Sequence, residues 1–116
     1  MENLKGRTKK FALDTIRICA LVPYKAEIQI ITRQLMRSAT SVAANYRAAC
    51  RGKSKADFIC KLSTVEEEAD ESMFWLEMLM EIQTNEKEEL TRLQNEASQL
   101  VAIMVSSKKT ARSNRE

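Results

Sequence analysis

Cationic side chains recur along residues 33–55, and arginine is the main type among them. On a helical wheel, at about 100° per residue, the arginines gather on the side opposite an apolar stripe. A guanidinium group matches a phosphate in bidentate geometry, so such a row could bind the backbone of RNA or DNA. The predicted nucleic-acid-binding residues are Arg33, Arg37, Arg47, Arg51, Lys53 and Lys55.

The same row has a second interpretation, a solvated face or arginines that pair with the carboxylates of a neighbour in subunit contacts. The sequence pI near 8.8 is only mildly basic, and no aromatic residues alternate with the cations to stack on bases. Binding to RNA or DNA would therefore depend on phosphates and carry little sequence specificity. The candidate acidic partners are Glu67, Asp70, Glu71 and Glu77, and basic residues that could extend the row are Lys108, Lys109 and Arg112.

A stripe of small polar residues lies beside the apolar one. Because buried polar groups must find hydrogen-bond partners, this stripe predicts a buried network between two helices. Its members are Gln34, Ser38, Ser41, Asn45 and Glu68, with Ser72 as a further partner. A ligand pocket around Trp75 and Asn45 is the alternative. On the network interpretation, Asn45→Leu would change assembly or helix register more than any chemistry.

Several kinds of catalytic and metal site are excluded by residue type. The chain has no histidine, so Ser-His, Cys-His and His-metal sites cannot form. The acidic run at residues 66–71 lacks the Glu-x-x-His pairs of a di-iron bundle. With only Gly6 and Gly52, no glycine-rich phosphate loop exists, and Cys50 and Cys60 lack zinc-ligand spacing. We therefore predict a protein that is not an enzyme, with no catalytic residue, no metal site and no cofactor.

The elements that would position these residues are helices. Two glycines and one proline among 116 residues leave few helix breakers, and the length suits one domain. Apolar residues at steps of three and four predict helices at about residues 6–22, 26–51, 55–83 and 86–106, with a flexible basic tail at 107–116. Short connections between amphipathic helices predict an all-α fold, an antiparallel up-down four-helix bundle.

Local signals set the expected helix ends and the core. Pro23 ends the first helix, because proline cannot continue a hydrogen-bonded helix. Ser54 with Asp57 predicts an N-cap for the third helix, and Thr84 or Asn85 is the expected cap of the fourth. The third-helix stripe includes Ile59, Met73 and Met80, and the second-helix stripe includes Tyr46. Inward-facing positions on the other stripes include Leu35, Val42, Leu62, Ala69, Leu76, Leu93 and Leu100.

Charge and cysteine content indicate the compartment. Residues 62–89 hold ten acidic and one basic residue, whereas residues 21–61 hold eight basic and two acidic ones. Such segments suit charged faces that meet within or between subunits, or a basic surface for a polyanion. Three cysteines, an odd number, and a polar first ten residues predict a cytoplasmic protein with reduced, mostly buried thiols. No apolar run approaches the ~20 residues of a membrane span.

Three sequence blocks resemble the bacterial four-helix bundle proteins related to those encoded in 23S rRNA intervening sequences. The blocks are "QLMRSATSVAANYRAA" (34–49), "SKADFICKLS" (54–63) and "EADESMFWLEML" (68–79). Together they span about half the chain, and their spacing is fairly specific. The resemblance implies a cytoplasmic bundle that assembles into a ring-like homo-oligomer, a homopentamer. Distant relatives include a basic bundle that binds nucleic acid and a reverse transcriptase, which implies RNA, DNA or another protein as partner.

The chain departs from the family pattern at three positions. Ala48 stands where the family usually has glutamate, and Glu66 and Glu67 stand where it has an apolar residue and lysine. These changes make the third helix more acidic and favour charge pairing between subunits. The sequence therefore predicts a non-enzymatic oligomeric bundle that binds RNA or DNA through phosphates. The alternative is a scaffold whose charged faces serve subunit assembly.

Overall fold

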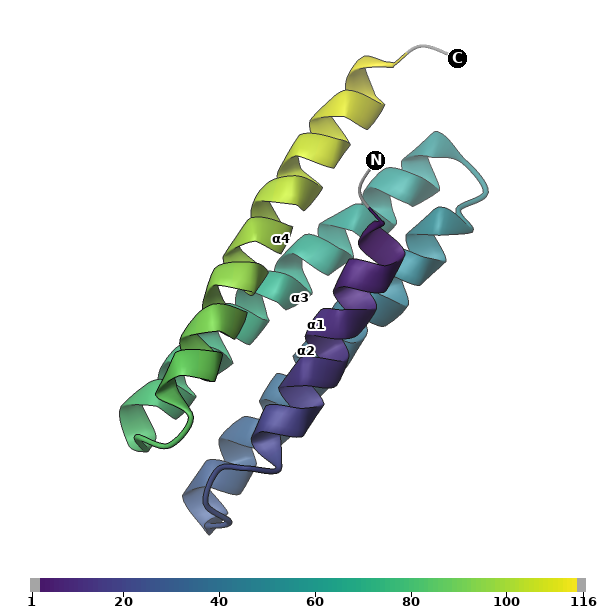
Figure 1. Ribbon diagram of the computed structural model, residues 1–116. Coiled ribbons are helices and arrows are strands. Elements are labelled where there is room, and N and C mark those ends of the chain that lie inside the picture. Colours follow the sequence, from purple (N-terminus) through teal and green to yellow (C-terminus); the bar gives the residue numbers. More distant parts are fainter. Residues whose placement is uncertain (1–2, 115–116) are drawn as a thin grey trace.

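Four α-helices make up almost all of residues 3–114, the part of the chain that the structure describes. This computed structural model arranges them as an antiparallel up-down bundle measuring 52 × 20 × 20 Å (Figure 1). The predicted all-α bundle is confirmed. The helices are α1 (Leu4–Cys19), α2 (Ala26–Cys50), α3 (Lys55–Ile82) and α4 (Lys87–Ser113).

The helices pack in a closed cycle, α1 on α2, α2 on α3, α3 on α4 and α4 back on α1. The α1–α4 seam is the least extensive, and ion pairs bridge it. Arg7 Nε donates to Glu96 Oε2 at 2.7 Å, and Arg92 Nη2 donates to Asp14 Oδ2 at 2.8 Å. Because the order is antiparallel, the start of α1, the end of α4 and the α2–α3 connection lie at the same end of the bundle (Figure 1).

Leucine and small apolar residues fill the core, as the helical spacing predicted. Burying one leucine side chain stabilises the fold by roughly 1.5–3 kcal/mol relative to leaving that side chain exposed. The seven positions predicted to face inward, from Leu35 to Leu100, are all fully buried. Four other predicted core residues are only half-buried. Tyr46, Met73 and Met80 pack against the core from its edge, and Ile59 is not among the residues that do so. Leu79 is fully buried instead, since α3 is covered on two sides, by α2 and by α4.

Side-chain caps fix the starts of two helices. The Asn3 side chain accepts a hydrogen bond from Gly6 N at 3.0 Å and caps α1. Ser54 accepts one from Asp57 N at 3.0 Å, which confirms the predicted N-cap of α3. The first helix ends at Cys19 rather than at residue 22, because Pro23 disfavours helical backbone in the residue before it and the last turn tightens ahead of it.

The α3–α4 connection differs from the prediction. Neither Thr84 nor Asn85 caps α4. Glu86 occupies the cap position in left-handed backbone, at φ 63°, and its side chain makes no capping bond. The Gln83 side chain closes the connection, donating to Leu79 O and Asn85 O and accepting from Asn85 N. The loop is thus held by one glutamine, which stands at the C-cap position of α3.

The predicted flexible tail at 107–116 is wrong for residues 107–113, which continue α4 as far as Ser113. Lys108 holds this part of the helix on α3, because its ammonium pairs with Glu66 Oε1 at 2.7 Å and donates to Ser63 Oγ at 3.1 Å. The Lys55 ammonium also donates to Asn114 O. Residues 115 and 116 lie outside the described part of the chain.

All three cysteines are free thiols, but they are not mostly buried as expected. Cys19 lies in the core, where burial raises the pKa of its thiol to about 11. Cys50 and Cys60 are exposed, one near the end of α2 and the other in the second turn of α3. The prediction of buried thiols rested on residue type. The helical pattern points the other way, because neither position belongs to an apolar stripe.

Candidate functional site

One end of the bundle gathers cationic side chains from four separate segments of the chain. We call this set the basic end. Lys5 and Lys9 of α1 line a groove together with Arg47 and Arg51 of α2. Lys53 follows in the adjoining hollow, and the bond from Lys55 to Asn114 O brings the end of α4 to the start of α3. The basic end comprises Lys5, Lys9, Arg47, Arg51, Lys53, Lys55, Lys109 and Arg112.

Few carboxylates neutralise the basic end. Between residues 42 and 65, Asp57 is the only acidic residue, and its carboxylate accepts from Lys53 N at 3.3 Å and lies 3.8 Å from Lys61 Nζ. Within residues 3–114, no ion pair involves the basic-end residues, and all of them except the half-buried Lys55 are exposed. The charge of this surface is therefore available to an external anion.

The predicted arginine row does not form one patch. Arg33 lies 18 residues before Arg51 on α2, which is roughly 27 Å along the helix axis. Arg37 is exposed but reaches across to α3, where it pairs with Glu68 and Glu71. Only Arg47, Arg51, Lys53 and Lys55 of the six predicted residues come together. The sequence-based prediction did not include Lys5 and Lys9 of α1. The four-helix topology could have indicated them, because four antiparallel helices place both chain ends beside the α2–α3 connection.

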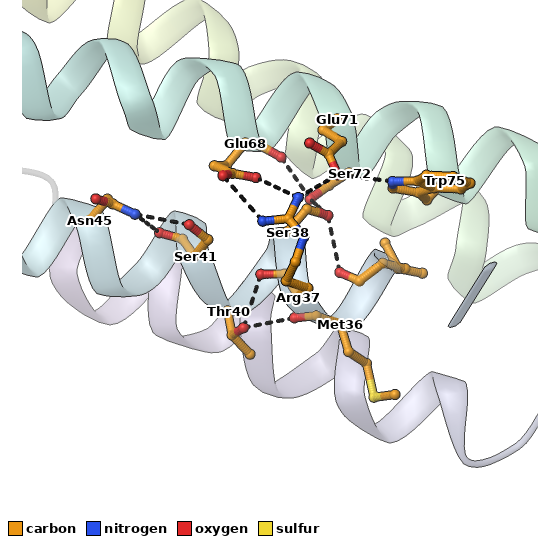
Figure 2. A network of polar contacts seen from close by, with 11 residues as sticks. Met36, Arg37, Ser38, Thr40, Ser41, Asn45, Glu68, Glu71, Ser72 and Trp75 are labelled. Atoms are coloured by element: carbon orange, nitrogen blue, oxygen red, sulfur yellow. Dashed lines mark hydrogen bonds and ion pairs between the residues drawn. The ribbon is translucent and has the colours of Figure 1, made fainter. Parts of the chain in front are cut away.

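Arg37 is the centre of an ion cluster between α2 and α3 (Figure 2). Its Nη2 donates to Glu68 Oε1 at 3.1 Å and to Glu71 Oε2, and the Trp75 indole donates to the same Glu71 oxygen at 3.1 Å. Burial raises the pKa of Glu71, but the hydrogen bonds from Arg37 and Trp75 outweigh it, so the pKa lies below its ordinary value. The cluster separates Trp75 from Asn45, so those two residues do not share a pocket (Figure 2).

This cluster predicts a pH-dependent signal from Trp75, the only tryptophan. A depressed carboxyl pKa stabilises the fold above the ordinary value of about 4.3, and the contribution is lost as pH falls through the folded-state pKa. Without Arg37, burial becomes the main influence on the pKa of Glu71 and raises it. Arg37→Gln is therefore expected to move the acid transition of Trp75 fluorescence to higher pH. The stability cost at pH 7 is below about 1 kcal/mol, because the pair is partly exposed.

The matched control for that titration is Arg33→Gln, which removes an exposed arginine one turn away that makes no ion pair within residues 3–114. Its acid transition should coincide with that of the wild type. Superimposable titrations of the Arg37 and Arg33 variants would show that the ion cluster does not set the ionisation of Glu71.

The predicted polar network separates into unconnected parts. Ser38 and Ser72, both fully buried, meet across the α2–α3 interface with their Oγ atoms 2.8 Å apart. Asn45 Nδ2 instead donates to Ser41 O and Oγ, both at 2.9 Å and both in its own helix (Figure 2). Gln34 is exposed, so its predicted place in a buried network is wrong. The side chain of Glu68 belongs to the ion cluster.

The serine pair, rather than Asn45, is therefore the polar contact that links the two helices. Ser38→Ala and Ser72→Ala are each expected to cost about 1 kcal/mol, because each leaves a buried hydroxyl without one partner. The double variant should cost less than the sum, since one shared contact is lost in both. Urea unfolding of the four proteins measures this coupling. Strict additivity would mean that the hydroxyls do not interact.

Metal-ligand clusters and membrane-spanning helices are both absent from residues 3–114. No group of three or more cysteine and carboxylate side chains is arranged to hold a metal ion in this part of the chain. Likewise, none of the helices that the structure describes is long and apolar enough to cross a membrane. The remaining surface features are charged faces and the hollows beside them.

Fold and site together define a small all-α bundle with a charged end. Comparison with known proteins assigns it more closely. The model of the family described as 23S rRNA-intervening sequence protein matches residues 4–106. The chain belongs to this family, which confirms the resemblance seen in the three sequence blocks.

A solved structure supports the same assignment. It is the 1.70 Å crystal structure of a protein of unknown function from the S23 ribosomal protein family of Bacteroides thetaiotaomicron. It shares 28% sequence identity with this chain and superimposes with a TM-score of 0.82, covering 90% of this chain and 97% of the other. No curated protein matches the chain.

Proposed function

We propose that this protein is a non-enzymatic binding protein whose basic end contacts the phosphate backbone of RNA or DNA. The observation that carries the proposal is the convergence of exposed cations from α1, α2, the α2–α3 connection and α4 at one end of the bundle. A dense positive surface with one nearby carboxylate, that of Asp57, favours a polyanion over a single small anion.

The chemistry of these side chains suits backbone contacts. Arginine and lysine on flexible stems neutralise phosphates and release condensed counterions, which supplies affinity without reading base edges. The family and the solved relative both carry ribosomal names, which makes RNA the first ligand to test. The absence of aromatic side chains among the basic-end residues predicts little discrimination between sequences.

Salt dependence tests this function. If about six phosphates are contacted, the affinity for a generic duplex RNA should fall ~10³-fold between 50 and 200 mM salt. Fluorescence anisotropy with a labelled duplex measures both affinity and slope. A lack of binding at 50 mM salt would remove the proposal.

A second candidate function, assembly into a homo-oligomeric scaffold, is favoured by acidic residues of α3 that find no partner within residues 3–114. The family resemblance suggests five subunits. Light scattering of the isolated protein is then expected to give about five times the 13.3 kDa of one chain. The mass of a single chain at every concentration would count against this candidate.

A further inference from the structure

A groove of about 750 Å³ runs between α1 and α2. Its floor is apolar, and two large side chains in it are left partly open, with Leu13 39% and Ile16 41% exposed. Ala43 and Ala44 of α2 keep the opposite wall low. The cationic side chains that line the groove are Lys5, Lys9, Arg47 and Arg51, none of which pairs with a carboxylate in residues 3–114.

A surface of complementary composition lies on α3. Phe74 is 49% exposed there, and acidic residues precede and follow it at alternating steps of three and four, which places all five residues on one helix face. We call them the acidic row of α3: Glu67, Asp70, Phe74, Glu77 and Glu81. Its four carboxylates form no ion pair within the described chain. Like charges at this spacing repel one another, so the row costs stability in an isolated subunit.

The two surfaces correspond in opposite charge, in polarity and in length. The groove has four cations toward one end and apolar side chains beyond them, and the row has two carboxylates on either side of an exposed aromatic ring. The groove extends over residues 5–16 of α1, roughly 17 Å, and the row over residues 67–81, roughly 21 Å. Phe74 is also held in place, because its ring contacts Trp75 edge-to-face with centroids 4.8 Å apart.

We infer that the α1–α2 groove of one subunit receives the acidic row of α3 from a second copy of the chain. This interface rests on the proposed homo-oligomer and names the surfaces that form it. Phe74 packs on Leu13 and Ile16, and the carboxylates on one side of Phe74 meet the cations toward the other end of the groove. Since α1 and α3 do not touch and stand diagonally in the bundle, each subunit offers its groove to one neighbour and its row to another.

Such a contact between two different surfaces is heterologous, and it generates closed rings or open chains rather than a two-fold dimer. The interface would use four residues that also belong to the basic end, Lys5, Lys9, Arg47 and Arg51. Lys53, Lys55, Lys109 and Arg112 lie outside the groove and stay available for nucleic acid in the assembled form.

Two charge-reversal variants test the interface. The groove variant carries Lys9→Glu and Arg47→Glu, and the row variant carries Asp70→Lys and Glu77→Lys. All four positions are exposed, so both proteins should fold, as circular dichroism can check. Each variant alone removes the charge attraction at the reversed positions and is expected to run as a single chain in light scattering at 50 mM salt. In an equimolar mixture, the reversed groove of one variant meets the reversed row of the other with opposite charges, so the mixture should associate and give a mass above that of either variant alone. A ring of five cannot alternate two kinds of subunit throughout, so recovery of the wild-type mass is not required.

An uncharged variant supports this test. Phe74→Ala is expected to weaken association at least tenfold without changing any charge. Variants that keep the wild-type mass, or a mixture that remains monomeric beside an oligomeric wild type, would overturn the interface alone. A monomeric wild type would overturn the oligomer and the interface together.

The proposal that the basic end binds nucleic acid can be tested independently of the subunit interface. The row variant should lose its oligomeric mass and still bind duplex RNA, since it leaves the basic end intact. Lys53→Gln should weaken RNA binding and leave the mass unchanged. Normal assembly of a protein that does not bind RNA would therefore refute only the first proposed function.

Discussion

Replacing Lys53, Lys109 and Arg112 with glutamine is expected to weaken RNA binding by about 10²-fold at 0.1 M salt. All three side chains are exposed, lie at the basic end and stand outside the α1–α2 groove. Each phosphate contact on a duplex contributes about 0.9 to the slope of log affinity against log salt. Three lost contacts should therefore lower the magnitude of that slope by about 2.7, which anisotropy titrations at several salt concentrations would measure.

The control for this experiment removes three cations elsewhere. Lys25, Arg33 and Lys87 are exposed, and none of them forms an ion pair within residues 3–114. Their triple glutamine variant has the same net charge as the test variant and should lose less than about threefold in affinity. Equal losses in the two variants would show that net charge, rather than the basic end, governs binding.

Leu76→Ala is expected to lower the free energy of unfolding by about 3 kcal/mol. Leu76 is fully buried on α3, the helix that packs against both α2 and α4. Truncating a buried leucine removes its transfer free energy and leaves a cavity that the neighbouring helices close only in part. For a chain of this length, thermal unfolding should shift down by about 10–15 °C.

Leu21→Ala is the matched control, since Leu21 is 60% exposed in the α1–α2 connection. The same chemical change there should cost less than about 0.5 kcal/mol. Chemical denaturation with urea gives both values on one scale. A cost below 1 kcal/mol for Leu76→Ala would contradict the packing at the centre of the bundle.

The apolar seams could be predicted because their information is local. Leu62, Ala69 and Leu76 recur every seven residues, and any helix with that spacing must bury the resulting stripe. Helix ends were less predictable, because different side chains and turn conformations can satisfy the same terminal N–H and C=O groups. The α3–α4 connection uses Gln83 and a left-handed Glu86, although nearby residues are better caps by type.

The destination of Arg37 could not be predicted from one helix. A wheel gives the angle of a side chain about its own axis, but it does not say which neighbour stands at that angle. Arg47 and Arg51 share a face with Arg33, yet the assembled bundle groups them with Lys5 and Lys9. These lysines lie about forty residues away in the chain, so the candidate site exists only once the helices are paired.

The dimensions of the bundle set a footprint for the basic end. Its cross-section is about 20 × 20 Å, so a duplex lying across it is covered for about six base pairs at ~3.4 Å each. That is little more than half of a helical turn. One subunit therefore contacts a duplex from one side only, and coverage of a longer stretch requires further subunits placed along the same strand.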